Sequence, residues 1–203
     1  MKFEHFKKLI PKIKNKSLPG LSAQLKLAPI GRSLLYNFQN PYKIAAVALI
    51  IYPDEEQETR LILIERNQYE GVHSGQVSFP GGKHEFNDSS LAETALRESN
   101  EEIGINLDSL ILLRKLSKIY IPPSNFLVTP FLFFSDQNLN FELNNEVKNI
   151  LIPSLNSVLN FQIKNYENQS IVNPYFLYNN FKIWGATAMI LNELVEIIKE
   201  QKS

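Results

Sequence analysis

Two apolar segments in the first third of the chain place the strongest constraint on the fold. Residues 43–53 read KIAAVALIIYP and residues 59–66 read TRLILIER, and the polar DEEQE separates them. Runs of β-branched and other apolar residues on either side of a short polar segment are typical of two strands joined by a loop. We therefore expect a β-sheet to begin at residue 43.

Further strands and helices are predicted along the rest of the chain. The glycine-containing residues 71–82 are expected to form a loop that leads into a short strand. Beyond it, we predict strands at 111–122 and 126–134, a strand and a short helix within 145–160, one or two strands within 173–187, and an amphipathic helix at 188–201. The sequence thus predicts one α/β domain with a mixed β-sheet and helices on both sides.

The N-terminal segment differs from the rest of the chain in charge. Residues 1–16 hold six lysines and one glutamate, and their apolar residues recur at helical spacing, although Pro11 would kink or limit a helix. We expect the apolar stripe to pack on the protein's own core or on a second subunit, and a helix lying on a membrane surface is the alternative. Residues 17–32 are expected to form an irregular, extended connection. These features divide the chain into residues 1–42 and a main domain at 43–203.

Composition narrows the classes of function. The 203 residues hold 21 basic and 21 acidic side chains, so no net charge points to a nucleic-acid partner. Cysteine is absent, which excludes disulfides, a thiolate nucleophile and Cys-ligated metals. No apolar run approaches the about 20 residues of a transmembrane helix, and no signal-peptide pattern is present. A cytoplasmic protein without a transmembrane segment is expected.

One segment gathers acidic residues on a short helix. Ser90 and Glu93 have the spacing of a capping box and Gly104 is a natural terminator, so we expect a helix from about 90 to 103. The side suited to packing on a sheet carries Ala92, Leu96, Ser99 and Ile103. A different side is expected to carry three carboxylates together, those of Glu98, Glu101 and Glu102.

These carboxylates are unfavourable neighbours unless something positive lies between them. They repel one another by about 0.2–0.5 kcal/mol per pair and lie near the negative end of the helix dipole. A hard divalent cation such as Mg²⁺ or Mn²⁺ would reverse both effects, because clustered carboxylate oxygens are its preferred ligands. For three glutamates alone, a solvated acidic face is the alternative. Gly81 and Gly82 favour the metal site, because glycine backbone can approach a metal or a phosphate closely.

The same residues resemble the Nudix box. Its pattern is Gly, five residues, Glu, seven residues, then Arg-Glu-U-x-Glu-Glu-x-Gly-U with U apolar. The matching positions are Gly82, Arg97, Glu98, Glu101, Glu102, Gly104 and Ile105. Asp88 replaces the first glutamate, eight residues separate it from Arg97, and Ser99 stands at an apolar position. The longer spacing leaves the role of Asp88 open and places it before the helix.

Neighbouring segments resemble one branch of that family, the coenzyme A pyrophosphatases. The segments that carry the likeness are FPGG at 79–82 with Leu63, Arg66 and Gly75 upstream, IPPSNFLVTPF at 121–131, and WGAT at 184–187. Asn67 and Gly71 depart from the branch pattern. The resemblance covers residues 43–198, and the lysine-rich residues before them match nothing.

The resemblance implies a Nudix-type α/β/α sandwich and an enzyme that hydrolyses a nucleoside diphosphate linked to another moiety. Coenzyme A or an acyl-CoA is the favoured substrate, which would give 4′-phosphopantetheine and adenosine 3′,5′-bisphosphate. Mg²⁺ or Mn²⁺ would neutralise the diphosphate and lower the pKa of the attacking water. ADP-ribose, dinucleotides and nucleoside triphosphates are alternative substrates, and a Nudix binding module without turnover is an alternative of another class.

The resemblance also implies roles for individual residues. Glu98 and Glu102 are expected to bind the metal, with Glu101 as a third ligand or water-activating group. Arg97 is expected to orient a glutamate by pairing with it. Glu146 is the positional candidate for the general base, and a solvated glutamate is the alternative. Gly82 is expected beside the metal, and the residues expected to contact substrate are Gly81, Gly82, Ser124, Asn125 and Phe126.

Further hypotheses concern the lysines of residues 1–16 and two histidines. The lysines are a candidate site for the 3′-phosphate of coenzyme A, and a lipid-surface role is the competing hypothesis. His73 and His84 flank the expected site; we expect them to be exposed polar residues, and contact with a phosphate is the alternative. A homodimer is compatible with the sequence.

Overall fold

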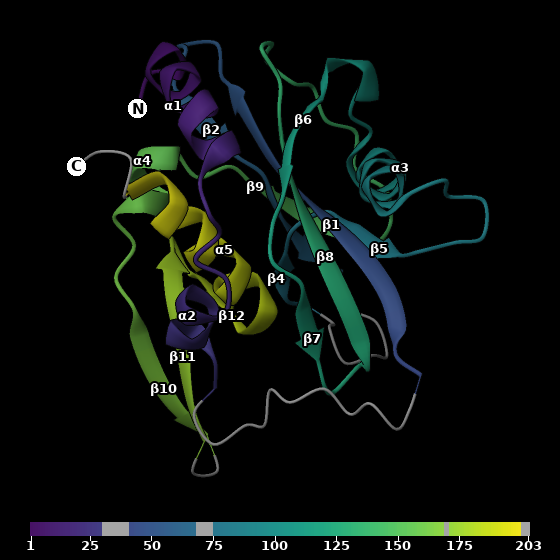
Figure 1. Cartoon of the computed structure of the whole chain (residues 1–203), viewed down its shortest axis with the longest axis vertical. Coiled ribbons are helices and arrows are strands. Elements are labelled where there is room, and N and C mark those ends of the chain that lie inside the picture. Colours follow the sequence, from purple (N-terminus) through teal and green to yellow (C-terminus); the bar gives the residue numbers. More distant parts are fainter. Residues whose placement is uncertain (30–40, 68–74, 169–170, 200–203) are drawn as a thin grey trace.

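The computed structural model describes residues 1–29, 41–67, 75–168 and 171–199 (Figure 1). The helices in these ranges are α1 (Phe3–Asn15), α2 (Leu21–Gln24), α3 (Leu91–Ile103), α4 (Leu155–Leu159) and α5 (Gly185–Lys199), with short 3-10 turns η1 (Leu25–Leu27) and η2 (Leu107–Ser109). The strands are β1 (Lys43–Pro53), β2 (Thr59–Leu61), β3 (Leu63–Arg66), β4 (Val77–Ser78), β5 (Gly81–Lys83), β6 (Ile111–Lys115), β7 (Ile119–Ile121), β8 (Phe126–Phe134), β9 (Val147–Leu151), β10 (Lys164–Asn168), β11 (Ile171–Tyr178) and β12 (Phe181–Trp184). Gly71 and His73 lie outside the described residues.

The largest sheet is mixed, as the sequence predicts. Its strand order is β2-β1-β8-β6, with β5 also paired to β1 and β7 to β8. Strands β1 and β8 run parallel from Lys43 beside Phe126 to Ile51 beside Phe134, and the other described pairs of this sheet are antiparallel. Two smaller antiparallel sheets, β4-β3-β9 and β10-β11-β12, accompany it.

Strand β1 is buried on both faces, because successive side chains of a strand point to opposite sides. Its residues in the core beneath α5 are Ala45, Leu49 and Ile51. Its residues in the second core, beneath α3, are Ala46, Ala48, Ile50 and Tyr52. Figure 1 shows α3 and α5 on opposite sides of the sheet. The predicted α/β/α sandwich is therefore confirmed.

Two of the predicted strand segments each form two separate strands, and one observed strand was not predicted. The segment at 59–66 forms β2, which pairs with β1, and β3, which belongs to the β4-β3-β9 sheet. The segment at 111–122 forms β6 and β7, which both pair with β8. Strand β10 was not predicted, because its sequence KNYEN is polar and lacks the β-branched run on which the other predictions depend.

The N-terminal helix belongs to the main core. Phe3, Phe6, Leu9 and Ile13 of α1 are buried in the same cluster as the side chains of α5. The prediction that this stripe packs on the protein's own core is confirmed, so the stripe is unavailable to a membrane. None of the helices in the described residues is long and apolar enough to cross a bilayer.

The expected extended connection after α1 is partly wrong. Residues Leu21–Leu27 form α2 and η1, and this short helical segment docks on α5 through polar contacts. Asn192 donates a hydrogen bond from Nδ2 to the Ala23 carbonyl at 2.8 Å, and Gln24 donates from Nε2 to Glu193 Oε2 at 3.2 Å. Tertiary contacts therefore favour helix in a segment whose Pro and Gly residues indicate a loop.

Replacing Phe6 by alanine tests whether α1 is part of the folded core. Phe6 is fully buried, so Phe6→Ala should lower the free energy of unfolding by about 3–5 kcal/mol. Lys8→Ala is the matched control on the exposed side of the same helix, where a change within about 0.5 kcal/mol is expected. Urea unfolding measures both. Equal stability of the two variants would contradict the packing of α1 on the core.

Candidate active site

Helix α3 begins and ends where its caps predict. The Ser90 Oγ accepts a hydrogen bond from the Glu93 backbone N–H at 3.2 Å, and Gly104 closes the helix in the left-handed conformation with φ of 63°. The Glu93 carboxylate accepts from the Ser89 N–H at 2.5 Å, one residue earlier than in a standard capping box. The predicted helix from about 90 to 103 is confirmed.

The three glutamates of α3 do not share one face. The Glu102 side chain is 2% exposed and turns toward the sheet, that of Glu98 is 17% exposed, and that of Glu101 is 54% exposed. The buried side of the helix consists of Thr94, Ala95, Ser99, Glu102 and Ile103. The prediction that all three acids project together is therefore wrong, because Glu102 occupies the sheet-facing side. Ala92 and Leu96, expected there, are half-buried.

Two donors hold the buried Glu102 carboxylate. The Gly81 backbone N–H donates to Oε2 at 2.9 Å, and Arg66 donates from Nη1 to Oε1 at 3.0 Å. Burial nevertheless raises the pKa of Glu102 to about 7, although Arg66 and Gly81 both favour the charged form. Helix α3 is thus tied to β5 and β3 through a carboxylate whose charge is costly to bury.

Gly82 brings the backbone of β5 against Glu98. A Cβ at Gly82 would overlap all three atoms of the Glu98 carboxyl group, so the absent side chain is what lets the carboxylate lie there. Arg97 donates from Nη2 to Glu98 Oε1 at 3.0 Å. Burial raises the pKa of Glu98 as well, with Arg97 opposing it. The predicted closeness of the glycine pair and the acidic helix is confirmed.

Arg97 joins the helix to the loop before it. It donates from Nε to Asp88 Oδ1 at 2.9 Å, from Nη1 to Glu101 Oε2 at 3.1 Å, and from Nη2 to the Lys83 carbonyl at 3.1 Å. The prediction that Arg97 pairs with a glutamate is confirmed for Glu98 and Glu101. The partner that holds it most firmly, however, is Asp88.

Asp88 is buried and lies before the helix, as its longer spacing predicts. It accepts hydrogen bonds from the Glu85 N–H at 2.9 Å and from Thr94 Oγ1 at 2.8 Å, in addition to those from Arg97. The Arg97 guanidinium holds the pKa of Asp88 well below its usual range. The His84 side chain is 34% exposed and contacts Thr94 Oγ1 through Nδ1 at 2.9 Å, so it is less exposed than expected, and its contact with a phosphate stays a prediction.

Glu146 reaches the site from a distant part of the sequence. It precedes β9, whose pairing with β3 aligns Val147 with Arg66. Arg66 donates from Nη2 to Glu146 Oε2 at 3.4 Å, and the Glu146 side chain is 66% exposed. Its negative charge is among the causes that raise the pKa of both Glu98 and Glu102. Arg66 therefore connects the exposed Glu146 to the buried Glu102.

Glu98, Glu102 and Glu146 are each paired with an arginine. Within the ranges that the structure describes, no three acidic or histidine side chains converge as a ready-made metal cage. Arg66 instead contacts Glu102 and Glu146, and Arg97 contacts Glu98. The donor set still suits a hard cation, because carboxylate oxygens are the ligands that Mg²⁺ and Mn²⁺ prefer. Residue roles in metal binding remain predictions.

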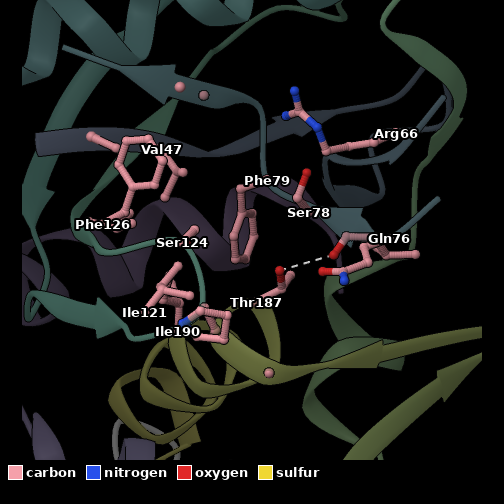
Figure 2. Close-up of a pocket in the computed structure, with 18 of the residues that line it drawn as sticks. Val47, Arg66, Gln76, Ser78, Phe79, Ile121, Ser124, Phe126, Thr187 and Ile190 are labelled. Carbon is pink, nitrogen blue, oxygen red and sulfur yellow. Dashed lines mark hydrogen bonds between the residues drawn. The ribbon is translucent and has the colours of Figure 1, made fainter. Parts of the chain in front are cut away.

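A cavity of about 380 Å³ adjoins the glycine pair (Figure 2). Gly81 and Gly82 line it together with the cations Arg66 and Lys83, and the first turn of α5 closes another side. Thr187 of that turn donates from Oγ1 to the Val77 carbonyl at 3.0 Å, which fixes α5 against β4. The cavity thus shares the wall that contacts Glu98 and Glu102.

The predicted substrate residues divide into two groups. Ser124 and Phe126 line the cavity, as do Gly81 and Gly82. The Asn125 side chain is used elsewhere. It accepts from the Tyr120 hydroxyl at 2.9 Å and donates to the Pro41 carbonyl at 3.2 Å, while its backbone adopts a φ of 55°. Asn125 therefore holds the turn between β7 and β8, and its side chain is not among those that line the cavity.

Sequence reasoning missed several lining residues. Arg66 and the segment from Trp184 to Thr187 received no role, although both lie in segments that resemble the coenzyme A pyrophosphatases. That resemblance was the available signal. The apolar character of these segments gave no indication of which side chains face a cavity, because that depends on how β4, β8 and α5 meet.

The lysines of residues 1–16 lie away from the cavity. Helix α1 is tied to the loop after β1, where the Phe3 N–H donates to the Gln57 carbonyl at 2.9 Å. The cavity is lined by Ala45 and Val47, from the first half of β1. Because a strand rises by about 3.3 Å per residue, the two ends of β1 are tens of ångströms apart. Figure 1 shows α1 and β7 at opposite ends of the sheet, so these lysines do not line the cavity, and their binding of the 3′-phosphate stays a prediction.

The raised pKa of Glu102 predicts a pH-dependent stability in metal-free protein. Between its ordinary value of 4.5 and about 7, the folded carboxyl holds a proton that the unfolded one has lost. Stability therefore falls as pH rises through this window. Relative to Glu102→Gln, which cannot titrate, wild-type protein should lose about 3 kcal/mol of unfolding free energy between pH 4.5 and pH 8.

Chemical unfolding at several pH values in a chelating buffer measures this difference. At pH 8, adding Mg²⁺ should stabilise the wild-type protein and leave Glu102→Gln almost unchanged, because a bound cation favours the ionised carboxylate. A stability difference that stays constant from pH 4.5 to pH 8 would contradict the burial of an ionisable group at this position.

Comparison with known proteins agrees with the geometry. A family model described as the NUDIX domain matches residues 41–165. The protein named "Uncharacterized Nudix hydrolase NudL" of Yersinia enterocolitica is 34% identical over 154 residues, which are 68% of this chain and 74% of the relative.

Solved Nudix structures share the fold. The Nudix hydrolase RenU from M. smegmatis superposes with a TM-score of 0.56 at 14% identity, over 84% of this chain and 96% of its own. A MutT protein from Methanosarcina mazei superposes with a TM-score of 0.54 at 21% identity, over 82% of this chain and 100% of its own. With the matched domain model and the 34% identical relative, these likenesses lead to one conclusion: the chain belongs to the Nudix hydrolase family.

Proposed function

We propose that the protein uses Mg²⁺ or Mn²⁺ to hydrolyse the diphosphate bond of coenzyme A or an acyl-CoA, giving 4′-phosphopantetheine and adenosine 3′,5′-bisphosphate. One observation carries the proposal. The carboxylates of Glu98 and Glu102 lie against the Gly81–Gly82 backbone, and the same glycines line a cavity of about 380 Å³. The carboxylates that could bind a metal and the cavity that could bind a substrate therefore adjoin the same glycine backbone.

Glu98 and Glu102 are the residues that would hold the metal, and Glu101 is a third candidate. Burial raises the pKa of both Glu98 and Glu102, so a cation that favours their ionised forms would relieve an unfavourable state. When bound, the ion supplies charge neutralisation at the diphosphate and a lower pKa for the attacking water. Glu101 is more exposed and paired with Arg97, so it would have to turn to join the other two.

The chain's own residues would position the substrate and move a proton. Gly81 and Gly82 let a diphosphate approach the backbone of β5, and Arg66 supplies positive charge at the same end of the cavity. Arg97 fixes the rotamers of Glu98 and Glu101 through its hydrogen bonds to both. Glu146 is the candidate general base, since it is exposed to water and shares Arg66 with Glu102.

The preference for coenzyme A is supported by where the branch-like segments lie. FPGG contributes Phe79, Gly81 and Gly82 to the cavity, and WGAT contributes its four residues. IPPSNF contributes Ile121, Pro123, Ser124 and Phe126. ADP-ribose, a dinucleotide or another nucleoside diphosphate derivative is the second candidate, because the acidic helix and the glycine pair would serve any of them. A non-catalytic module would have no need of these acids. The cytoplasmic location and a homodimer stay predictions of the sequence.

Removal of one carboxylate charge tests the metal-dependent chemistry. Glu98→Gln should fold and lose hydrolysis by a factor of about 10² or more, because a charge that stabilises the bound metal is gone. The measurement is mass spectrometry of products from coenzyme A, ADP-ribose, NADH and nucleotides with Mg²⁺ or Mn²⁺. Near-wild-type rates would remove Glu98 from the mechanism, and ADP-ribose as the best substrate would replace coenzyme A.

Replacement of Gly82 by alanine and replacement of Gly81 by alanine are expected to affect stability differently. In Gly82→Ala the new Cβ meets the end of the flexible Glu98 side chain, so the protein should stay folded while hydrolysis falls at least tenfold. In Gly81→Ala the Cβ meets the Ala46 carbonyl and Val47 Cα, and the backbone φ of 145° disfavours any side chain. Thermal unfolding should therefore show a large loss of stability for Gly81→Ala alone. Equal stability with full activity in both variants would contradict the close packing of β5.

A further inference from the structure

The cavity beside the glycine pair is lined by two charged residues and by side chains that are otherwise largely apolar. Its two cations, Arg66 and Lys83, flank Gly81 and Gly82, and none of the described residues that line it is acidic. The remaining surface is largely apolar and comes from β1, β8, α5 and the segment after β4; the apolar side chains include Val47, Phe79, Phe126, Val128 and Ile190. Its volume of about 380 Å³ lies within the about 300–1,000 Å³ of small-molecule sites.

Two hydroxyl groups without a partner in the described protein interrupt this apolar surface, in addition to that of Thr187, which is bonded to Val77. The Oγ atoms of Ser78 and Ser124 are buried and have no hydrogen-bond partner among the described residues. Buried polar atoms are nearly always bonded, because an unbonded one retains the full cost of losing water. Both serines line the cavity, and Figure 2 shows them on either side of the Phe79 ring. Each hydroxyl therefore lacks a partner in the described protein, and a molecule in the cavity would supply one once the serine side chain rotates toward it.

The placement of the two serines, on either side of an aromatic ring, selects among ligands. A sugar or a base presents adjoining polar groups at one place, and a second nucleotide would carry phosphate charge into apolar surroundings. An uncharged chain with polar groups separated by apolar stretches matches both the two hydroxyls and the surface between them. Its amide groups could bond to Ser78 and Ser124 while its carbon atoms contact Phe79 and Phe126.

We propose that this cavity binds an uncharged, amide-bearing chain attached to the diphosphate, with the hydroxyls of Ser78 and Ser124 hydrogen-bonded to its amides. The inference rests on the proposed function for the position of the diphosphate, which lies at the end lined by Arg66 and Lys83. It deepens that function by assigning the cavity to the neutral half of the substrate. The nucleoside half then lies outside the cavity, on the other side of the glycine pair.

Binding of pantetheine tests this assignment without metal and without turnover. Pantetheine carries two amides and no phosphate, so its titration into the full-length protein by calorimetry reports on the cavity alone. We expect saturable binding that weakens about three- to tenfold in Ser78→Ala and in Ser124→Ala. Ser22→Ala is the matched control, since Ser22 is an exposed serine of α2 bonded to the Pro19 carbonyl, and it should bind as the wild type does.

Kinetics supply a second readout. The ratio of kcat/KM for coenzyme A to that for ADP-ribose should fall in both variants, mainly through KM for coenzyme A, because ADP-ribose has no amide chain. Thermal unfolding verifies that each variant is folded, and removal of an unbonded hydroxyl should not destabilise it.

Three outcomes would overturn the inference: no binding of pantetheine, equal affinity in the wild type and both serine variants, or weakened binding of adenosine 3′,5′-bisphosphate in place of pantetheine. These are distinct from a failure of the proposed function. Coenzyme A hydrolysis without pantetheine binding would overturn the cavity assignment alone. Pantetheine binding without hydrolysis of any diphosphate would overturn the proposed function and leave the assignment intact.

Discussion

The site depends on the contact between the buried Glu102 carboxylate and the Gly81 backbone N–H. This hydrogen bond of 2.9 Å joins the end of α3 to β5, and β5 is itself paired to the central strand β1. The same carboxylate accepts from Arg66, which connects α3 to β3. Burying the charge of a carboxylate that is 2% exposed costs free energy unless hydrogen-bond donors compensate it. Both donors are therefore needed, and one of them is the backbone N–H of Gly81, whose φ is positive.

Two arginines organise the acids around this contact. Arg97 holds Asp88, Glu98 and Glu101, and so fixes the loop before α3 to the exposed side of the helix. Arg66 joins Glu102 of α3 to Glu146, which precedes β9. The arginines thus neutralise part of the negative charge of Glu98 and Glu102. The pKa of each carboxyl is still raised, so burial outweighs the effect of the arginines.

Helix α5 links the core to the cavity. Its buried side chains pack in the same cluster as those of α1, while its first turn lines the cavity and bonds to β4 through Thr187. The short α2 segment and the N-terminal helix therefore support the far side of the element that shapes the cavity. This arrangement gives the lysine-rich segment a structural role, since α1 lies at the other end of the sheet from the cavity.

Local chemistry made several features predictable from the sequence. The apolar run at 43–53 is β1 to the residue, and the Ser90 and Gly104 caps bound α3, because caps and continuous apolar runs act over a few residues. The sequence likewise predicted that the glycine pair lies beside the acidic helix, where Gly82 contacts Glu98 and Gly81 bonds to Glu102. Features without a local signal were missed, such as the polar strand β10 and the helical turn at α2.

The sequence by itself determined the layered α/β fold, the bounds of the acidic helix and the residue types at the site. The tertiary structure alone decided that Glu102 is buried while Glu101 is exposed, that Arg66 and Glu146 meet beside them, and that Ser78 and Ser124 face one cavity. The physical reason is distance along the chain. Burial, ion pairing and cavity shape arise where β3, β9, α3 and α5 pack together, and no short stretch of sequence contains that information.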